Sequence, residues 1–108
     1  MDEFNFDIFK NLCNQLESLR ILLTDIESNR LFDGYHFPYL KQLSLSRCFI
    51  ERVDKIFINR FPMLIRLNIN SCRLETIEDE AFSNLNQLRY LGLPGNQIRF
   101  IGKNAFFN

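Results

Sequence analysis

The chain has 108 residues, of which 46% are hydrophobic and 24% charged, and its 13 basic residues balance its 13 acidic residues. This length supports one domain with a modest core, and a net charge of zero gives no sign of a nucleic-acid or anionic-membrane partner. No apolar run approaches the roughly 18 residues of a membrane-spanning helix, so we expect no membrane segment in this chain. Twelve phenylalanines and no tryptophan indicate that the fold uses phenylalanine repeatedly.

The first 15 residues allow two interpretations. Their start, MDEFNFDIFK, is acidic and its apolar positions are interrupted, so it is not a secretory signal peptide. The sequence FKNL at 9–12 corresponds to FSNL at 82–85, which favours the back half of a repeat. The alternative for residues 1–15 is an N-terminal amphipathic capping helix, because apolar residues also recur there at helical spacing.

From Leu16 onward the apolar residues repeat every 24 residues without a gap. Each unit has Leu or Ile at its first, fourth and sixth positions, Thr, Cys or Asn at the ninth and an aliphatic residue at the eleventh. The expected units are 16–39, 40–63, 64–87 and 88–108, the last of them incomplete. Because both ends fall inside a repeat, we expect a fragment of a longer array. Its last unit would expose these residues: Leu91, Leu93, Ile98 and Phe106.

Each unit predicts one short strand. Leu43, Ser44 and Leu45 alternate apolar and polar residues, so the two leucines point to one side. The equivalent strands should stack into a parallel sheet, because no unit can bury its leucines alone. Further inward residues of the same unit are Leu40, Ile50, Val53 and Phe61.

Three local features modify this regular pattern. The first unit has Gly34 where later units have Ile or Phe, and Phe32 is its expected substitute. The acidic segment 78–82 (EDEAF) is interpreted as the start of a helical segment. Pro94 and Gly95 replace the usual polar strand end, so the last strand should be bent or shortened.

The pattern L-x-x-L-x-L-x-x-N/C-x-L resembles the leucine-rich repeat, in its 24-residue animal class found in extracellular and receptor ectodomain arrays such as Toll-like receptors. The resemblance implies an α/β solenoid: a right-handed superhelix with a short parallel β-sheet on the concave face and irregular or short helical return segments. It also implies that the ninth residue of each unit turns inward and hydrogen-bonds the backbone. This structural ladder would comprise Thr24, Cys48, Cys72 and Asn96.

The ladder cysteines have a structural interpretation, although a thiol is only a weak donor compared with an amide. Cys48 and Cys72 would lie on strands about 4.8 Å apart with parallel side chains. A disulfide needs Cβ atoms about 3.8 Å apart, so we predict free, buried thiols. Cys13 lies outside the ladder and is expected to be more exposed.

In the resembled family, the outward residues of the strands form a concave face that commonly binds proteins. The partner-binding candidates transferred by position are Arg20, Gln42, Ser44, Ser46, Arg47, Arg66, Asn68, Asn70 and Tyr90. Bases exceed acids on and beside this face, with Arg20, Lys41, Arg47, Arg66 and Arg89 against Glu17. We therefore expect a protein partner with a polar or acidic surface, and the alternative is a solvated face with chance segregation of charge. Tyr90 and Arg66 are the best hot-spot candidates by residue type.

The residues give no sign of catalysis. His36 is the one histidine and is interpreted as an ordinary residue of a return segment. No spacing typical of metal ligands occurs, and residues 92–96 (GLPGN) lack the Lys and Ser/Thr of a phosphate loop. We therefore predict no enzyme activity, cofactor, metal, small-molecule substrate or nucleic-acid partner.

The sequence thus favours a protein-protein interaction module. The resemblance implies an extracellular or cell-surface protein for recognition, adhesion or receptor signalling, although the chain shows no signal peptide. The alternative is an intracellular scaffold or adaptor in the cytoplasm. A structural fragment with no binding of its own is the third possibility.

Overall fold

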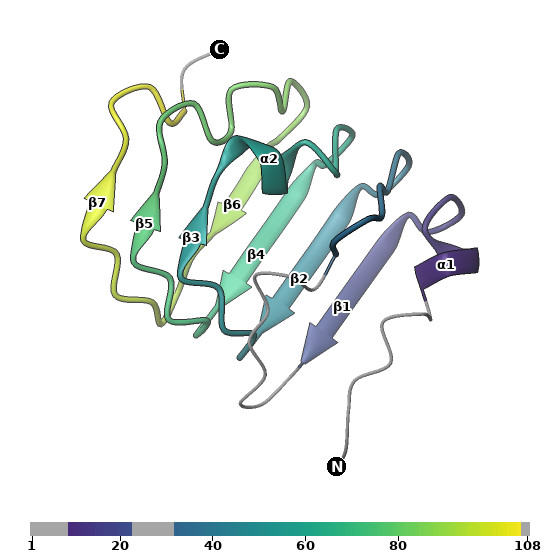
Figure 1. The fold of residues 1–108 in the computed structure, drawn as a ribbon, viewed down its shortest axis with the longest axis horizontal. Helices are drawn as coiled ribbons and strands as arrows, with labels where there is room; N and C mark the ends of the chain where they lie inside the picture. The colour runs from purple at the N-terminus through teal and green to yellow at the C-terminus, as the bar shows by residue number, and fades with distance from the viewer. Residues whose placement is uncertain (1–8, 23–31, 107–108) are drawn as a thin grey trace.

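The computed structural model describes residues 9–22 and 32–106 (Figure 1). Its largest element is a four-stranded parallel sheet with strand order β1-β2-β4-β6. Residues 24 positions apart pair directly, as Leu19 does with Leu43 and Leu43 with Leu67. The chain is therefore a solenoid whose coils stack in register, as predicted. The strands are β1 (Ser18–Leu22), β2 (Gln42–Ser46), β4 (Arg66–Asn70) and β6 (Tyr90–Gly92).

A second parallel sheet, with the order β3-β5-β7, follows the return side of the coils (Figure 1). Its strands are β3 (Arg52–Val53), β5 (Thr76–Ile77) and β7 (Phe100–Ile101). The expectation of irregular or short helical return segments missed this sheet. Each strand has only two residues, which is too short for an alternating pattern. The inward β-branched Val53 and Ile77 suit a pleated, buried strand surface.

The helices of the described part are single turns, α1 (Phe9–Leu12) and α2 (Lys55–Ile58). Asp54 caps α2, because its carboxylate accepts a hydrogen bond of 2.8 Å from the backbone N–H of Phe57. The two interpretations of residues 1–15 stay predictions, since residues 1–8 lie outside the described ranges. Across those ranges, no helix is long and apolar enough to cross a membrane.

The helical interpretation of residues 78–82 is wrong, because residues 79–84 form turns. Glu78 stands where Asp54 caps α2 in the preceding coil, and glutamate is not among the preferred N-cap residues. Glu80 adopts a left-handed backbone with φ of 59°, which is incompatible with a continuing helix. A change in one capping residue is thus accompanied by loss of the helical turn.

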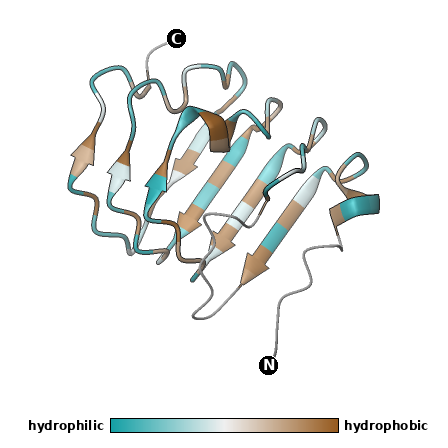
Figure 2. Cartoon of the chain, in the orientation of Figure 1, coloured by the Kyte–Doolittle hydropathy of each residue, from teal (hydrophilic) through white to brown (hydrophobic). Residues whose placement is uncertain are grey.

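The core lies between the two sheets and is continuous along the stack. Leucine and isoleucine bands alternate with polar bands along β1, β2 and β4 (Figure 2), and the inward residues predicted from the second unit are all buried. Phenylalanines fill the return side: the ring centroid of Phe61 lies 5.2 Å from that of Phe32 and 5.5 Å from that of Phe37. Phe32 is 1% exposed, so the prediction that it substitutes at Gly34 is confirmed.

The end of the stack formed by β6 and β7 differs from the middle. β6 has three residues where β2 and β4 have five, so the prediction of a shortened last strand is confirmed. Phe100, Ile101 and Phe106 are more than half exposed. Three further residues of this end are half-buried against the core: Leu91, Leu93 and Ile98.

Close approach of two coils makes Gly102 sensitive to substitution. A Cβ at Gly102 would clash with the backbone nitrogen of Asp79 and lie 2.5 Å from its Cα. We expect Gly102→Ala to lower the free energy of unfolding by about 1–3 kcal/mol, because the backbone must move to relieve the overlap. Urea unfolding should show this loss and little change for the adjacent exposed control Lys103→Ala. Equal stabilities of the two variants would contradict the close approach.

Candidate functional site

The outward side chains of the four-stranded sheet form a surface that we call the strand face. Because the strands pair in register, its residues form rows across the sheet. A groove of about 340 Å³ lies over the first two rows. The first row contains Ser18, Gln42, Arg66 and Tyr90, the second contains Arg20, Ser44, Asn68 and Gly92, and the third contains Leu22, Ser46 and Asn70.

The structure brings most of the predicted binding residues together. Those that line the groove are Arg20, Gln42, Ser44, Arg66, Asn68 and Tyr90. Ser46 and Asn70 lie in the third row, outside the groove. Arg47 follows β2 in a left-handed backbone conformation with φ of 56°, so it lies at the turn and not on the sheet. Ser18, Gly92 and four leucines complete the lining of the groove, the leucines being Leu19, Leu43, Leu67 and Leu91.

Arg66 and Tyr90 form the best-defined contact of the strand face. They are direct cross-strand neighbours on β4 and β6, and the Arg66 guanidinium carbon lies 4.2 Å from the centroid of the Tyr90 ring. Stacking on the ring face holds the guanidinium by a cation–π interaction while leaving its N–H edge available. The residue types alone suggested both side chains, but the contact between them follows from pairing across 24 residues.

The groove carries uncompensated positive charge. In the described part of the chain, no carboxylate forms an ion pair with Arg20 or Arg66, and no acidic residue lines the groove. Beside the groove, Lys41 Nζ lies 3.6 Å from Glu17 Oε1, so these two flanking charges compensate each other. Of the excess bases predicted from the sequence, Arg20 and Arg66 are the two that line the groove.

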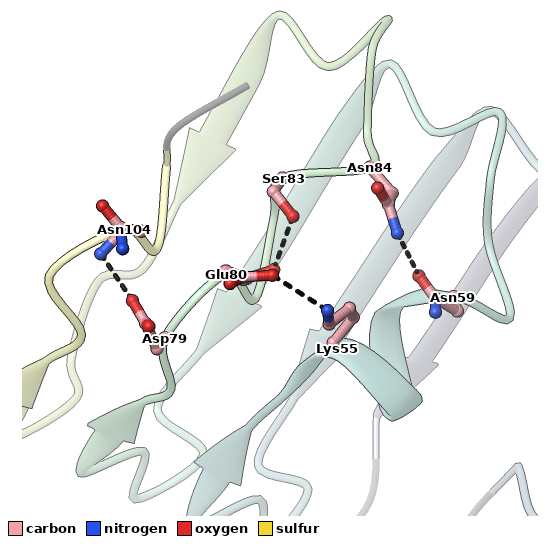
Figure 3. Close-up of polar contacts among 7 residues, drawn as sticks. All are labelled: Lys55, Asn59, Asp79, Glu80, Ser83, Asn84 and Asn104. Atoms are coloured by element: carbon pink, nitrogen blue, oxygen red, sulfur yellow. Dashed lines mark hydrogen bonds and ion pairs between the residues drawn. The ribbon is translucent and has the colours of Figure 1, made fainter.

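Polar groups on the return side are instead paired between successive coils (Figure 3). Lys55 Nζ donates to Glu80 Oε1 at 2.9 Å. Two more contacts in the same region join Asn84 to Asn59 and the Asn104 backbone N–H to Asp79. These three contacts of the return side thus connect adjacent coils, whereas the two groove arginines have no ion-pair partners in the described structure.

The ninth residues occupy the ends of the strands. The Asn96 side-chain oxygen accepts hydrogen bonds from the backbone N–H groups of Cys72 at 2.8 Å and Leu74 at 3.1 Å. Its amide nitrogen donates to the carbonyl oxygen of Ile69 at 2.8 Å. Cys72 Sγ makes a longer contact of 3.6 Å to the carbonyl of Leu45. Thr24 lies outside the described residues.

All three cysteines are buried, and among the described residues none of them forms a disulfide. Cys48 and Cys72 are 0% and 1% exposed, and Cys13 is only slightly more exposed at 8%, because it packs into the core. A side-chain hydrogen bond from Cys48 stabilises the Cys72 thiolate, and backbone hydrogen bonds assist it. These contacts outweigh burial and lower the pKa of Cys72 from 9.0 to about 7.

The lowered pKa of Cys72 predicts a pH-dependent stability. Unfolding returns the pKa to its higher ordinary value, so thiolate formation stabilises the folded state fully above pH 9 and less as pH falls through about 7. We expect the free energy of unfolding to rise by about 1 kcal/mol per pH unit between these limits. Urea unfolding in reductant at several pH values should show this rise in Cys13→Ser but not in Cys72→Ser. The same slope in both variants would contradict the assignment to Cys72.

Groups associated with metal or acid–base chemistry are dispersed. Among residues 9–22 and 32–106, no three His, Cys, Asp or Glu side chains gather in a way that could hold a metal ion. His36 is exposed and lies in the segment that precedes β2.

A family model described as leucine rich repeat matches residues 38–98, which are 61 of the 108 residues. The matched segment contains β2, β4 and β6, and thus three of the four strands that form the strand face. Neither the comparison with curated proteins nor that with solved structures gave a significant match.

Proposed function

Because the chain belongs to the leucine-rich repeat family, we propose that it is a non-enzymatic module that binds a protein partner on the strand face. The observation that carries the proposal is the contrast between the two sides of the solenoid. Return-side groups such as Lys55 and Glu80 are paired between coils, while Arg66 and Tyr90 present a stacked, exposed pair within a groove. Arginine and tyrosine are enriched among residues that dominate binding energy.

The 24-residue repeat class favours a role in extracellular recognition, adhesion or receptor signalling. The second candidate is an intracellular scaffold or adaptor. One observation is compatible with this second candidate: no disulfide joins the described cysteines, as is typical of proteins in the cytosol. In both cases the same strand face would contact the partner.

The test places a large side chain in the groove and leaves the core residues unchanged. Ser44 lies in the middle of β2 and faces outward between Arg20 and Asn68, so Ser44→Trp should block the groove. Asn84→Trp on the exposed return side is the matched control. The immobilised chain and both variants are used for affinity capture from secreted and cytosolic fractions, with circular dichroism as the check of folding.

We expect a protein that wild type and Asn84→Trp capture and that Ser44→Trp does not, with direct binding then measured on the purified pair. The fraction that supplies this protein distinguishes an extracellular from an intracellular role. Capture that survives Ser44→Trp but not Asn84→Trp would move the site to the return side. No specific capture from either fraction would favour a purely structural role. Either of these last two results contradicts the proposal.

A further inference from the structure

We propose that the partner segment bound in the groove is an extended acidic peptide with two carboxylates four residues apart, one for Arg66 and one for Arg20. This inference rests on the proposed function and adds the chemistry of the partner. It follows from the charge, spacing and free volume of the strand face.

The charge of the groove favours an acidic partner. The groove has two guanidinium groups and no acidic residue among its described lining, and the nearby Glu17 is already paired with Lys41. The chain as a whole is neutral, whereas the charged side chains that line the groove are both arginines. A concave surface lined by one sign of charge concentrates ligands of the opposite sign.

Arg66 provides the anchor. Its guanidinium is held 4.2 Å from the Tyr90 ring centroid, so part of its side-chain freedom is already lost before a partner binds. A planar guanidinium with a free edge matches a carboxylate through two parallel hydrogen bonds. Tyr90 therefore acts as a positioning residue for Arg66.

The spacing of the arginines sets the spacing of the carboxylates. Arg20 and Arg66 are separated by two strand steps and by two residues along the strands. With strands about 4.8 Å apart and a rise of about 3.3 Å per residue, their Cα atoms lie roughly 12 Å apart. In an extended peptide, residues i and i+4 lie about 13 Å apart and point to the same side.

The open part of the groove lies between the two arginines. The Asn68 side-chain oxygen would lie 2.9 Å from a Cβ at Gly92, so the Asn68 amide covers the space above that glycine. The residues between Arg20 and Arg66 are Ser44 and Gln42, whose hydroxyl and amide groups can hydrogen-bond a peptide backbone. A peptide that crosses the sheet diagonally from Arg20 to Arg66 reaches both guanidinium groups without displacing a core residue.

The experiment titrates the complete chain with synthetic nine-residue Gly/Ser peptides and follows backbone amide shifts by NMR. The test peptide has Glu at i and i+4. Its controls have Gln at both positions, or Glu at i and i+3 so that the carboxylates point to opposite sides. We expect shifts on β1, β2, β4 and β6, about tenfold weaker binding of the Gln peptide and weaker binding of the i+3 peptide.

Protein variants test the roles of the individual residues. Arg66→Gln and Arg20→Gln should each weaken binding of the acidic peptide by about tenfold, while Arg99→Gln outside the groove should not change it. Tyr90→Phe should keep binding within about twofold, because the ring face remains. Tyr90→Leu alone should weaken binding of the Glu peptide. Added to the Arg66→Gln variant, Tyr90→Leu should not weaken the remaining binding further. This interdependence distinguishes positioning of Arg66 from a general packing effect.

Equal binding of the Glu and Gln peptides would overturn the inference. So would equally tight binding of a ten-nucleotide oligothymidylate, since that would indicate general attraction of polyanions. If either result occurs while Ser44→Trp still abolishes capture of a protein partner, the acidic-peptide inference fails and the proposed function stands. If the peptides instead shift amides of the return side and Ser44→Trp leaves capture intact, both fail.

Discussion

Replacing Phe61 by alanine should lower the free energy of unfolding by about 3–5 kcal/mol, as expected when a fully buried aromatic side chain is deleted from a core. Phe61 is 0% exposed, and its ring lies within 5.6 Å, centroid to centroid, of three other phenylalanine rings: Phe32, Phe37 and Phe57. These residues come from successive coils, so the cavity would weaken contacts between coils as well as within one. Urea unfolding followed by circular dichroism measures the loss.

Phe100 offers a matched control for Phe61, because it is also a phenylalanine but 56% exposed on β7. We expect Phe100→Ala to change stability by about 0.5 kcal/mol or less, as exposed substitutions usually do. Phe61→Leu should lie between the two alanine variants, since it preserves part of the buried volume. A Phe61→Ala loss as small as that of Phe100→Ala would show that the phenylalanine cluster does not support the stack.

The repeated part of the fold could be predicted because a solenoid converts a sequence period directly into spatial neighbours. Once Leu43 and Leu67 are recognised as equivalent, their strands must lie side by side. The same reasoning identified Phe32 as a core residue although it is two positions from the expected site. Deviations were predictable where a residue changes backbone chemistry, as Pro94 does at the end of β6.

Local hydrogen bonds on the return side were harder to predict. Two-residue strands such as β3 carry no alternation that separates them from a loop. The segment after β5 has helix-compatible acidic residues, yet Glu78 stands at the position where Asp54 caps α2 one coil earlier. Which conformation forms depends on one side-chain hydrogen bond and on the neighbouring coil, and neither is visible in the residue pattern of a single unit.

The candidate site was predictable in composition but not in electrostatics. Position within the repeat is enough to place Gln42, Ser44 and Arg66 on one face. The compensation of Lys41 by Glu17, by contrast, depends on contacts between coils, as does the stacking of Arg66 on Tyr90. Comparing residues 24 positions apart as pairs would have revealed these contacts, because cross-strand neighbours in a parallel solenoid are separated by one repeat.

Replacing Asn96 by alanine should lower the free energy of unfolding by about 2–4 kcal/mol. The Asn96 oxygen accepts from the backbone N–H groups of Cys72 and Leu74, at 2.8 and 3.1 Å. Alanine would leave both donors without this partner, and a buried unsatisfied donor costs about 1–3 kcal/mol. The lost donation to the Ile69 carbonyl adds to the effect. The measurement is urea unfolding of both proteins at one pH in the presence of reductant.

Two further variants separate the ladder role of Asn96 from a general effect of losing an asparagine. Asn84→Ala removes an exposed amide with one side-chain hydrogen bond of 3.4 Å to Asn59 and should change stability by about 0.5 kcal/mol or less. Asn96→Cys should be less destabilising than Asn96→Ala, because Cys72 occupies the equivalent position one coil earlier and its sulfur contacts backbone carbonyls there. If Asn96→Ala were as stable as Asn84→Ala, the inward amide would not be what holds the last two strand ends together.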